Sequence, residues 1–209
     1  VAFLEELDNP IYKIASSDVN YVDMLEVIGA TKKPVFLSTG KCTLSDMDMA
    51  IELLQKSGTT DLCLLHCVAN YPSKMENMNL NVIKTLKQMY PECIIGFSDH
   101  SLGITASLGA ICFGAKIIEK HFTIDKNLEG PDHWFSMDPV DMKNLVIGIR
   151  NLELAFGTQR KFLSQNGSIF QRLDNIETLR LKDKIEIDEK FDKIFDAFSQ
   201  ADASTTRRF

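Results

Sequence analysis

The stretches GFSDHSLG, residues 96–103, and KIIEKHFTIDK, residues 116–126, decide the fold that we expect for this chain. Each is an apolar run that leads to a histidine, His100 in the first and His121 in the second. The short apolar segment between them has the length of a helix, so together they predict a strand, a helix and a second, parallel strand. In such sheets ligands bind at the C-terminal ends of the strands, where the loops open.

Alternation along the two strands predicts which side chains meet. Ser98 and His100 share one face of the first strand, and Glu119 and His121 share one face of the second. The histidines can therefore meet at one rim, which predicts a metal or substrate site. The alternative is that each histidine only caps its strand by bonding a nearby backbone group. Two histidines in matching positions favour the site.

Three further residues near this rim need interpretation. Asp99 has the parity of the helix-facing side, so we expect a structural role that orients a ring or a loop. Glu119 would lie deep in the pore and needs a cationic or metal partner. His133, in the loop EGPDH of residues 129–133, is a third candidate ligand, although a solvated loop residue is the commoner case.

Five strand and helix units are expected along the chain. Strands are predicted at residues 11–16, 34–39, 62–68, 93–99 and 115–123, each followed by a helix, at residues 21–28, 44–56, 79–89, 102–113 and 139–156. The strands are apolar on both faces, which indicates a parallel sheet. Polar residues at the strand ends, and the absence of a glycine-rich dinucleotide fingerprint, favour a barrel over an open sheet.

The fold class is therefore α/β, a parallel (β/α)8 TIM-barrel type with only five units present. A complete barrel takes about 250 residues. We expect residues 1–157 to be its C-terminal part, with three units preceding Val1. Residues 158–209 are expected to form a charged helical tail, with an amphipathic helix at 169–198.

Composition limits the classes of partner and compartment. The chain has 209 residues, a net charge of −6 and a pI near 5.3, so nothing in its charge predicts a nucleic acid or an anionic membrane as partner. No apolar run approaches the roughly 20 residues of a membrane span. Five cysteines without regular spacing indicate reduced thiols in a cytoplasmic protein, and we interpret Cys63 and Cys67 as core residues.

The first predicted strand carries three polar candidates. Ser16 and Asp18 share a parity and are expected to face the barrel mouth, which leaves Lys13 on the other parity unless a bulge turns it. A lysine in an apolar strand is costly to bury without an anionic partner. Either Lys13 has such a partner, or its stem extends to the bottom rim.

Other polar positions follow the second and third strands. Residues 38–41, STGK, suit an anion at a helix N-terminus, but a plain helix cap is the more common explanation. His66 precedes its strand end and is expected to be a hydrogen-bonded core residue. Tyr71 is a loop aromatic that could contact a sugar or cover the site.

At this point the chain resembles the N-acetylneuraminate (sialic acid) synthase family, which includes the legionaminic and pseudaminic acid synthases. The matching segments, within residues 12–157, are YKIASSD, PVFLSTG, LLHCVANYP, GFSDHSLG, AKIIEKHFTIDKNLEGPDH and SMDP. The resemblance implies a (β/α)8 barrel that condenses phosphoenolpyruvate with an N-acetylmannosamine-type sugar. It also implies a divalent cation, Mn²⁺ or Mg²⁺, and a homodimer in the full-length family.

The resemblance also assigns roles residue by residue. It implies metal ligands at His100 and His121, phosphoenolpyruvate contacts at Lys13, Ser16 and Ser98, acceptor-sugar contacts at Tyr71 and Asp132, and a catalytic carboxylate at Asp18, where many members have glutamate. The role of Glu119, an acidic position of the motif, stays open. Ala69 stands where some members have an asparagine, and Lys41 replaces a common methionine; neither excludes activity.

Two departures from the family leave alternatives. The first three units are not in the sequence, and residues 158–209 lack the motifs of the small antifreeze-like domain that relatives carry. A catalytically incomplete chain that acts at most as a binding or interface module is therefore the main alternative. Another metal-dependent, aldolase-like barrel is a weaker one.

Overall fold

Five parallel strands form one sheet, in the order in which they occur along the chain. They are β1 (Tyr12–Ile14), β2 (Val35–Ser38), β3 (Leu62–Cys67), β4 (Ile94–Asp99) and β5 (Ile118–Lys120). The computed structural model describes residues 1–158, and Val1–Gly157 form one compact unit. Within the described residues this is a half-barrel of the (β/α)8 type, as the sequence predicts.

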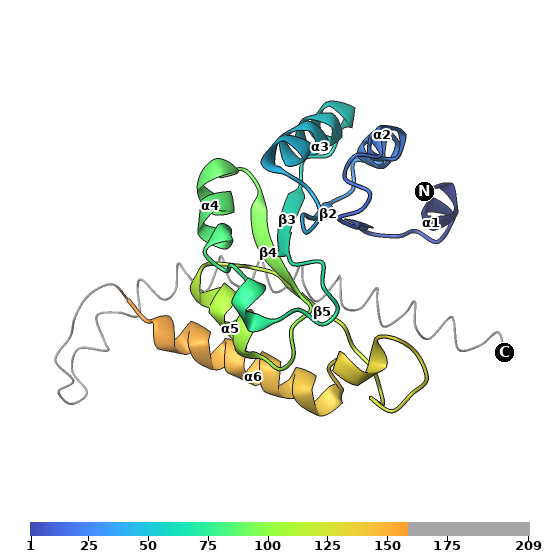
Figure 1. The fold of residues 1–209 in the computed structure, drawn as a ribbon. Helices are drawn as coiled ribbons and strands as arrows, with labels where there is room; N and C mark the ends of the chain where they lie inside the picture. The colour runs from blue at the N-terminus through green and yellow to red at the C-terminus, as the bar shows by residue number, and fades with distance from the viewer. Residues whose placement is uncertain (159–209) are drawn as a thin grey trace, which may run out of the picture. The chain divides into compact units, whose positions relative to one another are not determined.

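Helices α2 to α5 connect consecutive strands, α1 precedes β1 and α6 follows β5. They are α1 (Ala2–Glu6), α2 (Val22–Ala30), α3 (Leu44–Ser57), α4 (Val82–Met89), α5 (Thr105–Cys112) and α6 (Pro139–Phe156), with single 3-10 turns η1 (Met75–Asn77) and η2 (His133–Phe135). Figure 1 shows α3, α4, α5 and α6 following one another around one side of the sheet. Apart from Thr158, the predicted tail of residues 158–209, with its helix at 169–198, lies outside the described residues.

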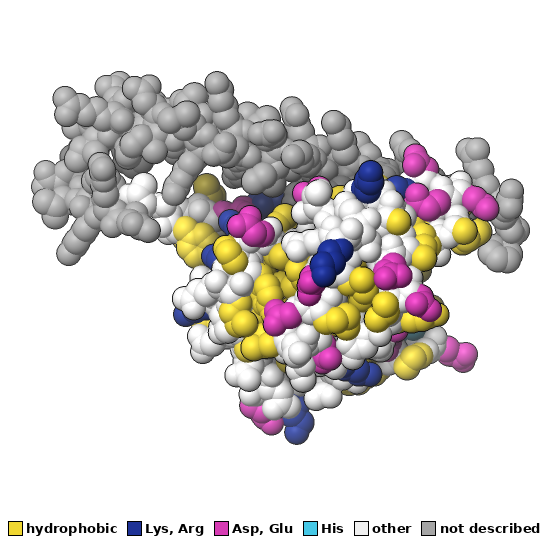
Figure 2. Space-filling view, turned by 90° about the horizontal axis from the view of Figure 1, so that it is seen from above, with side chains coloured by type: hydrophobic (Ala, Val, Ile, Leu, Met, Phe, Trp, Pro, Cys, Tyr) yellow, Lys and Arg dark blue, Asp and Glu magenta, His cyan; other side chains and the backbone are white. Residues whose placement is uncertain are grey.

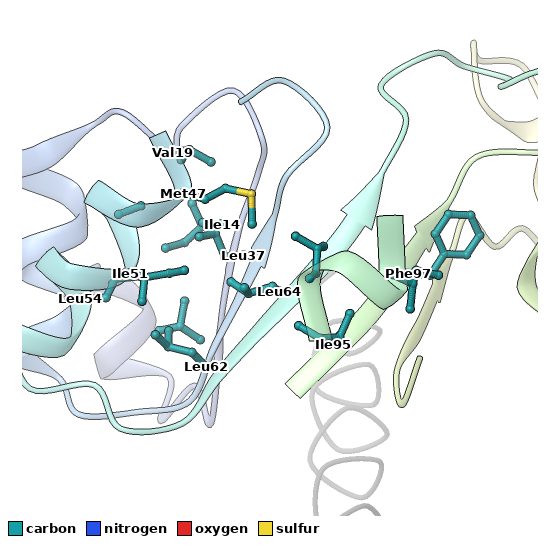
Figure 3. Packing of buried hydrophobic residues seen from close by; sticks show 14 of the residues in the cluster. Ile14, Val19, Leu37, Met47, Ile51, Leu54, Leu62, Leu64, Ile95 and Phe97 are labelled. Carbon is teal, nitrogen blue, oxygen red and sulfur yellow. The ribbon is translucent and has the colours of Figure 1, made fainter. Parts of the chain in front are cut away.

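The core lies between the sheet and these helices. A row of apolar side chains runs across four strands, because the register pairs Ile14 with Leu37, Leu37 with Leu64, and Leu64 with Ile95. Leu54 of α3 is also fully buried in this cluster, which Figure 3 shows in close view. Burying one such side chain contributes roughly 1.5–3 kcal/mol, so this row holds the strands in register.

The start of α3 has a plain helix cap, which follows residues 38–41. Thr43 is its N-cap: Thr43 Oγ1 accepts from Asp46 N (3.2 Å), and the Asp46 carboxylate accepts from Thr43 N (2.7 Å). This is a complete capping box, in which each residue satisfies a backbone N–H of the other. The cap is made by Thr43 and Asp46, outside residues 38–41, so an anion site at residues 38–41 stays a prediction.

The strands are shorter than predicted, and for the first strand this alters which side chains strand parity can place. β1 ends at Ile14, and a turn follows in which Asp18 N donates to Ala15 O (3.0 Å). Lys13 points away from Tyr12 and Ile14, which are buried toward the helices, so it faces the interior of the half-barrel. The expectation that Lys13 lies opposite the barrel interior is wrong. The strand ends before Ser16 and Asp18, so strand parity does not determine where these two side chains face.

The surface carries both signs of charge. Figure 2 shows one face, on which acidic and basic side chains are interspersed with hydrophobic ones. Within residues 1–158 no helix is long and apolar enough to span a membrane.

Candidate active site

His100 and His121 converge at one rim of the sheet. Each histidine directly follows its strand, His100 after β4 and His121 after β5. The centres of the two imidazole rings are 5.2 Å apart, and the ring planes are inclined by 76°. This confirms the convergence that alternation along the strands predicts.

The His100 ring is fixed by the backbone of the neighbouring strand connection. Its Nδ1 lies 3.0 Å from Val68 O. A carbonyl oxygen only accepts, so Nδ1 carries the proton and Nε2 keeps a free lone pair. Burial lowers the pKa of His100, because removal from water disfavours the imidazolium. The backbone bond foreseen as an alternative to a ligand role is present, and it leaves the other nitrogen available as a ligand.

His121 is held by a carboxylate and an aromatic ring. Asp132 Oδ2 lies 3.5 Å from His121 Nδ1, and the ring centre of Phe135 is 5.1 Å from that of His121. A carboxylate beside one imidazole nitrogen orients the ring. Asp132 therefore lies at the histidine pair.

The spacing of the two rings suits one shared cation. A metal ion about 2.1 Å from a ring nitrogen lies about 3.2 Å from the ring centre, so two ligating imidazoles have centres roughly 4.5–5.5 Å apart. The observed 5.2 Å falls in this range. Among residues 1–158 no group of three or more His, Cys, Asp and Glu side chains is arranged to hold a metal ion. The described residues therefore bring together two imidazoles at a separation that suits one shared ion.

Tyr71 covers the histidine pair. Its ring centre is 4.2 Å from that of His100 and 5.6 Å from that of His121, and the Tyr71–Pro72 peptide bond is cis. The loop is fastened to the same rim, since Ser73 N donates to His100 O (2.9 Å). Tyr71 remains half exposed, so it presents a polar tip beside the rings.

A second cluster joins Lys13, Ser98 and Glu119. Lys13 Nζ lies 3.4 Å from Glu119 Oε2, and Ser98 Oγ donates to Glu119 Oε1 (2.5 Å). Ser98 and Glu119 are register partners on β4 and β5. Glu119 thus has the cationic partner that its position requires, and Lys13 has the anionic one. The bottom-rim alternative for Lys13 is excluded.

Ser16 and Asp18 stand apart from these groups. Both lie in the turn after β1, where Ser17 Oγ donates to Asp18 Oδ1 (3.2 Å). The hydrogen bonds and ion pairs of the described residues do not join either side chain to His100, His121 or Glu119.

The remaining histidines and thiols have ordinary roles. His66 Nε2 lies 2.8 Å from Met78 O in the core, as expected for a hydrogen-bonded core histidine. His133 Nδ1 lies 2.7 Å from Thr123 Oγ1, so its ring is engaged within its loop. Cys63 and Cys67 are free and buried, as predicted, and burial raises the pKa of the Cys63 thiol to about 12.

The sequence prediction missed one residue next to the site, Lys120. On the helix-facing side its Nζ lies 3.1 Å from Asp99 Oδ2, and both side chains are almost fully buried. Asp99 also accepts from Ser107 Oγ (2.6 Å), which confirms its predicted structural role. The missed signal was two opposite charges at helix-facing parity on consecutive strands, each directly before a histidine.

Comparison with known proteins finds one family model and several named relatives that are similar to this chain. The sequence model described as "NeuB family" matches residues 1–161. N,N'-diacetyllegionaminic acid synthase of Legionella pneumophila is 41% identical over 170 residues, covering 79% of this chain and 48% of that protein. The enzyme of the same name from Campylobacter jejuni is 35% identical over 209 residues, covering 99% and 60%.

Solved structures agree with this. The crystal structure of N-acetylneuraminic acid (sialic acid) synthetase from Leptospira borgpetersenii, in complex with citrate, superposes with a TM-score of 0.73 at 35% identity, covering 86% of this chain and 61% of that one. The chain spans about half the length of the curated relatives it matches.

Proposed function

Since the chain belongs to the NeuB family, we propose that it condenses phosphoenolpyruvate with N-acetylmannosamine or a related N-acyl sugar. The products are a nonulosonic, sialic-type acid and phosphate. Relatives named as legionaminic, pseudaminic and N-acetylneuraminate-9-phosphate synthases support this substrate class. The proposal includes a cytoplasmic protein, a homodimer in its full-length form, and no nucleic acid or membrane partner.

The single observation that carries the proposal is the pairing of two clusters on one side of the sheet. The imidazole ring centres of His100 and His121 lie 5.2 Å apart at the rim. On β4 and β5, the strands that these histidines follow, Ser98 and Glu119 bond each other, and Glu119 also pairs with Lys13 of β1. An enolpyruvate donor needs a cation and hydroxyl donors for its anionic groups, and an aldehyde acceptor needs an electrophile beside them.

Each group then has a task in the reaction. Lys13 and Ser98, with Ser16 from the adjoining turn, bind the phosphate and carboxylate of phosphoenolpyruvate. Tyr71 and Asp132 contact the acceptor sugar beside the rings. Asp18 transfers a proton to or from the water that adds to the intermediate. The new bond joins the enol carbon to the sugar aldehyde carbon, and water addition releases phosphate.

His100 and His121 would hold a divalent metal, Mn²⁺ or Mg²⁺, which as a Lewis acid supplies polarisation of the aldehyde when bound. The neutral state of His100 and its free Nε2 suit this role, because a ligating imidazole must be unprotonated. Asp132 beside His121 suits it as an orienting carboxylate.

Phosphate release tests the proposal directly. We expect the 209-residue chain, incubated with Mn²⁺, phosphoenolpyruvate and N-acetylmannosamine, to release phosphate only when all three are present. His121→Ala is expected to abolish the release, and Glu92→Gln, an exposed change at the far end of β4, to leave it unchanged. Release that is insensitive to His121→Ala would contradict the proposal.

A second function has an observation in its favour. The described sheet has only five strands, and a closed barrel of this type has eight. The chain would then be a metal-binding or subunit-interface module without turnover. Mn²⁺ binding without phosphate release, with release restored by adding the first half of a relative's barrel, would select this second function.

A further inference from the structure

A buried ion pair lies directly behind the two rim histidines. Asp99 precedes His100 and Lys120 precedes His121, and the two are register partners on β4 and β5. Lys120 Nζ and Asp99 Oδ2 are 3.1 Å apart, with side chains 4% and 0% exposed. They point toward the helices, so neither can touch a substrate at the rim.

Both members of the pair also bond the residue that follows His100. Ser101 N donates to Asp99 Oδ1 (2.8 Å), and Lys120 Nζ donates to Ser101 O. His100 therefore lies between Asp99, whose side chain is in the ion pair, and Ser101, whose backbone N–H and C=O both bond the pair. Lys120 directly precedes His121 in the chain, so one ion pair joins the residues that precede the two histidines and also bonds the backbone of Ser101.

We infer that Asp99 and Lys120 are a positioning pair that sets the separation and orientation of the His100 and His121 imidazoles. The inference rests on the proposed function, because metal binding is the task for which the two imidazoles need this alignment. A buried ion pair can often be replaced by apolar groups without loss of stability, so stability alone does not account for it. Groups that orient metal ligands from behind typically change metal affinity by 10–100-fold.

The test separates alignment from stability by comparing single and double variants. Lys120→Met leaves the Asp99 carboxylate buried without its cation, so it is expected to lower both stability and Mn²⁺ affinity. Asp99→Asn combined with Lys120→Met removes both charges and is expected to regain stability, but Mn²⁺ affinity is expected to stay about 10–100-fold below that of the unmodified chain. Lys120→Arg, which keeps a donor for Ser101 O and Asp99, is expected to restore the affinity.

Three readouts are needed on the full 209-residue chain. Mn²⁺ affinity is followed by the electron paramagnetic resonance signal of the free ion, and stability by urea unfolding. The His100 tautomer is followed by imidazole ¹⁵N shifts without metal; a single Nδ1–H form is expected in the unmodified chain, and a mixture in the double variant, because Nδ1 then loses its fixed approach to Val68 O. Leu54→Ala, a destabilising change on α3, serves as the matched control.

The outcomes test the inference whether or not the unmodified chain binds Mn²⁺. If the double variant regains both Mn²⁺ affinity and a single His100 tautomer along with its stability, the pair is only structural and the inference fails. The same holds if Leu54→Ala weakens Mn²⁺ binding as much as the double variant. If the unmodified chain binds no Mn²⁺, the metal step of the proposed function fails, and the tautomer comparison alone decides the inference.

Discussion

Glu119→Gln is expected to tighten the binding of phosphoenolpyruvate to the metal-free protein. In the structure the Glu119 carboxylate pairs with Lys13 and accepts a hydrogen bond from Ser98, and the proposed function assigns both of these groups to the anionic substrate. Glutamine has the same shape and still accepts from Ser98, but it no longer neutralises Lys13. The substitution therefore removes a competing negative charge without opening a cavity.

The magnitude follows from the geometry at Lys13 Nζ. Glu119 Oε2 lies 3.4 Å from this nitrogen, and a bound phosphate oxygen would lie about 2.8 Å from it, so the two oxygens are at most about 6 Å apart. At that distance the repulsion of two unit charges is roughly 1.5–3 kcal/mol for effective dielectric constants of about 20–40. Removing it tightens binding by about 10–100-fold. The Lys13–Glu119 pair is partly exposed, so its loss costs the fold no more than about 1 kcal/mol.

Titration calorimetry with phosphoenolpyruvate at low salt measures this change. Glu92→Gln is the matched control, because it alters the net charge equally and lies exposed just before β4, at the strand end opposite the rim. We expect Lys13→Met to abolish the binding in both backgrounds. Equal affinities for the Glu119→Gln variant and the unmodified chain, or an equal gain in the Glu92→Gln control, would refute the reasoning.

Three further predictions address the metal, acid stability and the helix cap. His100→Ala is expected to weaken Mn²⁺ binding by more than about 100-fold, since a ligand is lost rather than an orienting group, and paramagnetic titration checks this. Burial lowers the pKa of His66 and of His100, so the unfolded chain binds more protons below pH about 6.5. The free energy of unfolding should therefore decrease as the pH is lowered, by up to about 1.4 kcal/mol per pH unit for each histidine. In urea unfolding, His66→Gln should remove its share of that slope. Thr43→Ala should cost about 1 kcal/mol of unfolding free energy while leaving phosphoenolpyruvate affinity unchanged, because the α3 cap is lost but the histidine rim is not touched.

The fold and the histidine rim could be predicted from the sequence because both depend on local pattern. Apolar runs that alternate with amphipathic segments indicate parallel strands, and the period of two places His100 and His121 on one side of their strands. Both signals are contained within a few residues. The convergence of the rings needs only that the two strands are neighbours, which chain order supplies.

The position of Lys13 could not be predicted, for two physical reasons. Parity carries information only while the strand lasts, and β1 ends at Ile14, two residues before Ser16. The partner of Lys13 is Glu119, more than a hundred residues along the chain and on the opposite edge strand. Nothing in the local pattern of β1 specifies which carboxylate reaches across the half-barrel.

The two faces of β4 and β5 carry different groups next to the histidine rim. Alternation directs Ser98 and Glu119 inward, where they meet Lys13, and directs Asp99 and Lys120 outward, where they meet each other. The histidines follow immediately, so one peptide unit separates each member of the outward pair from a rim histidine. Substitutions at the outward pair should therefore change ring alignment, whereas substitutions at Glu119 should change the charge seen by the substrate. The geometry and the electrostatics of the rim can thus be changed separately, and the two sets of variants distinguish their contributions.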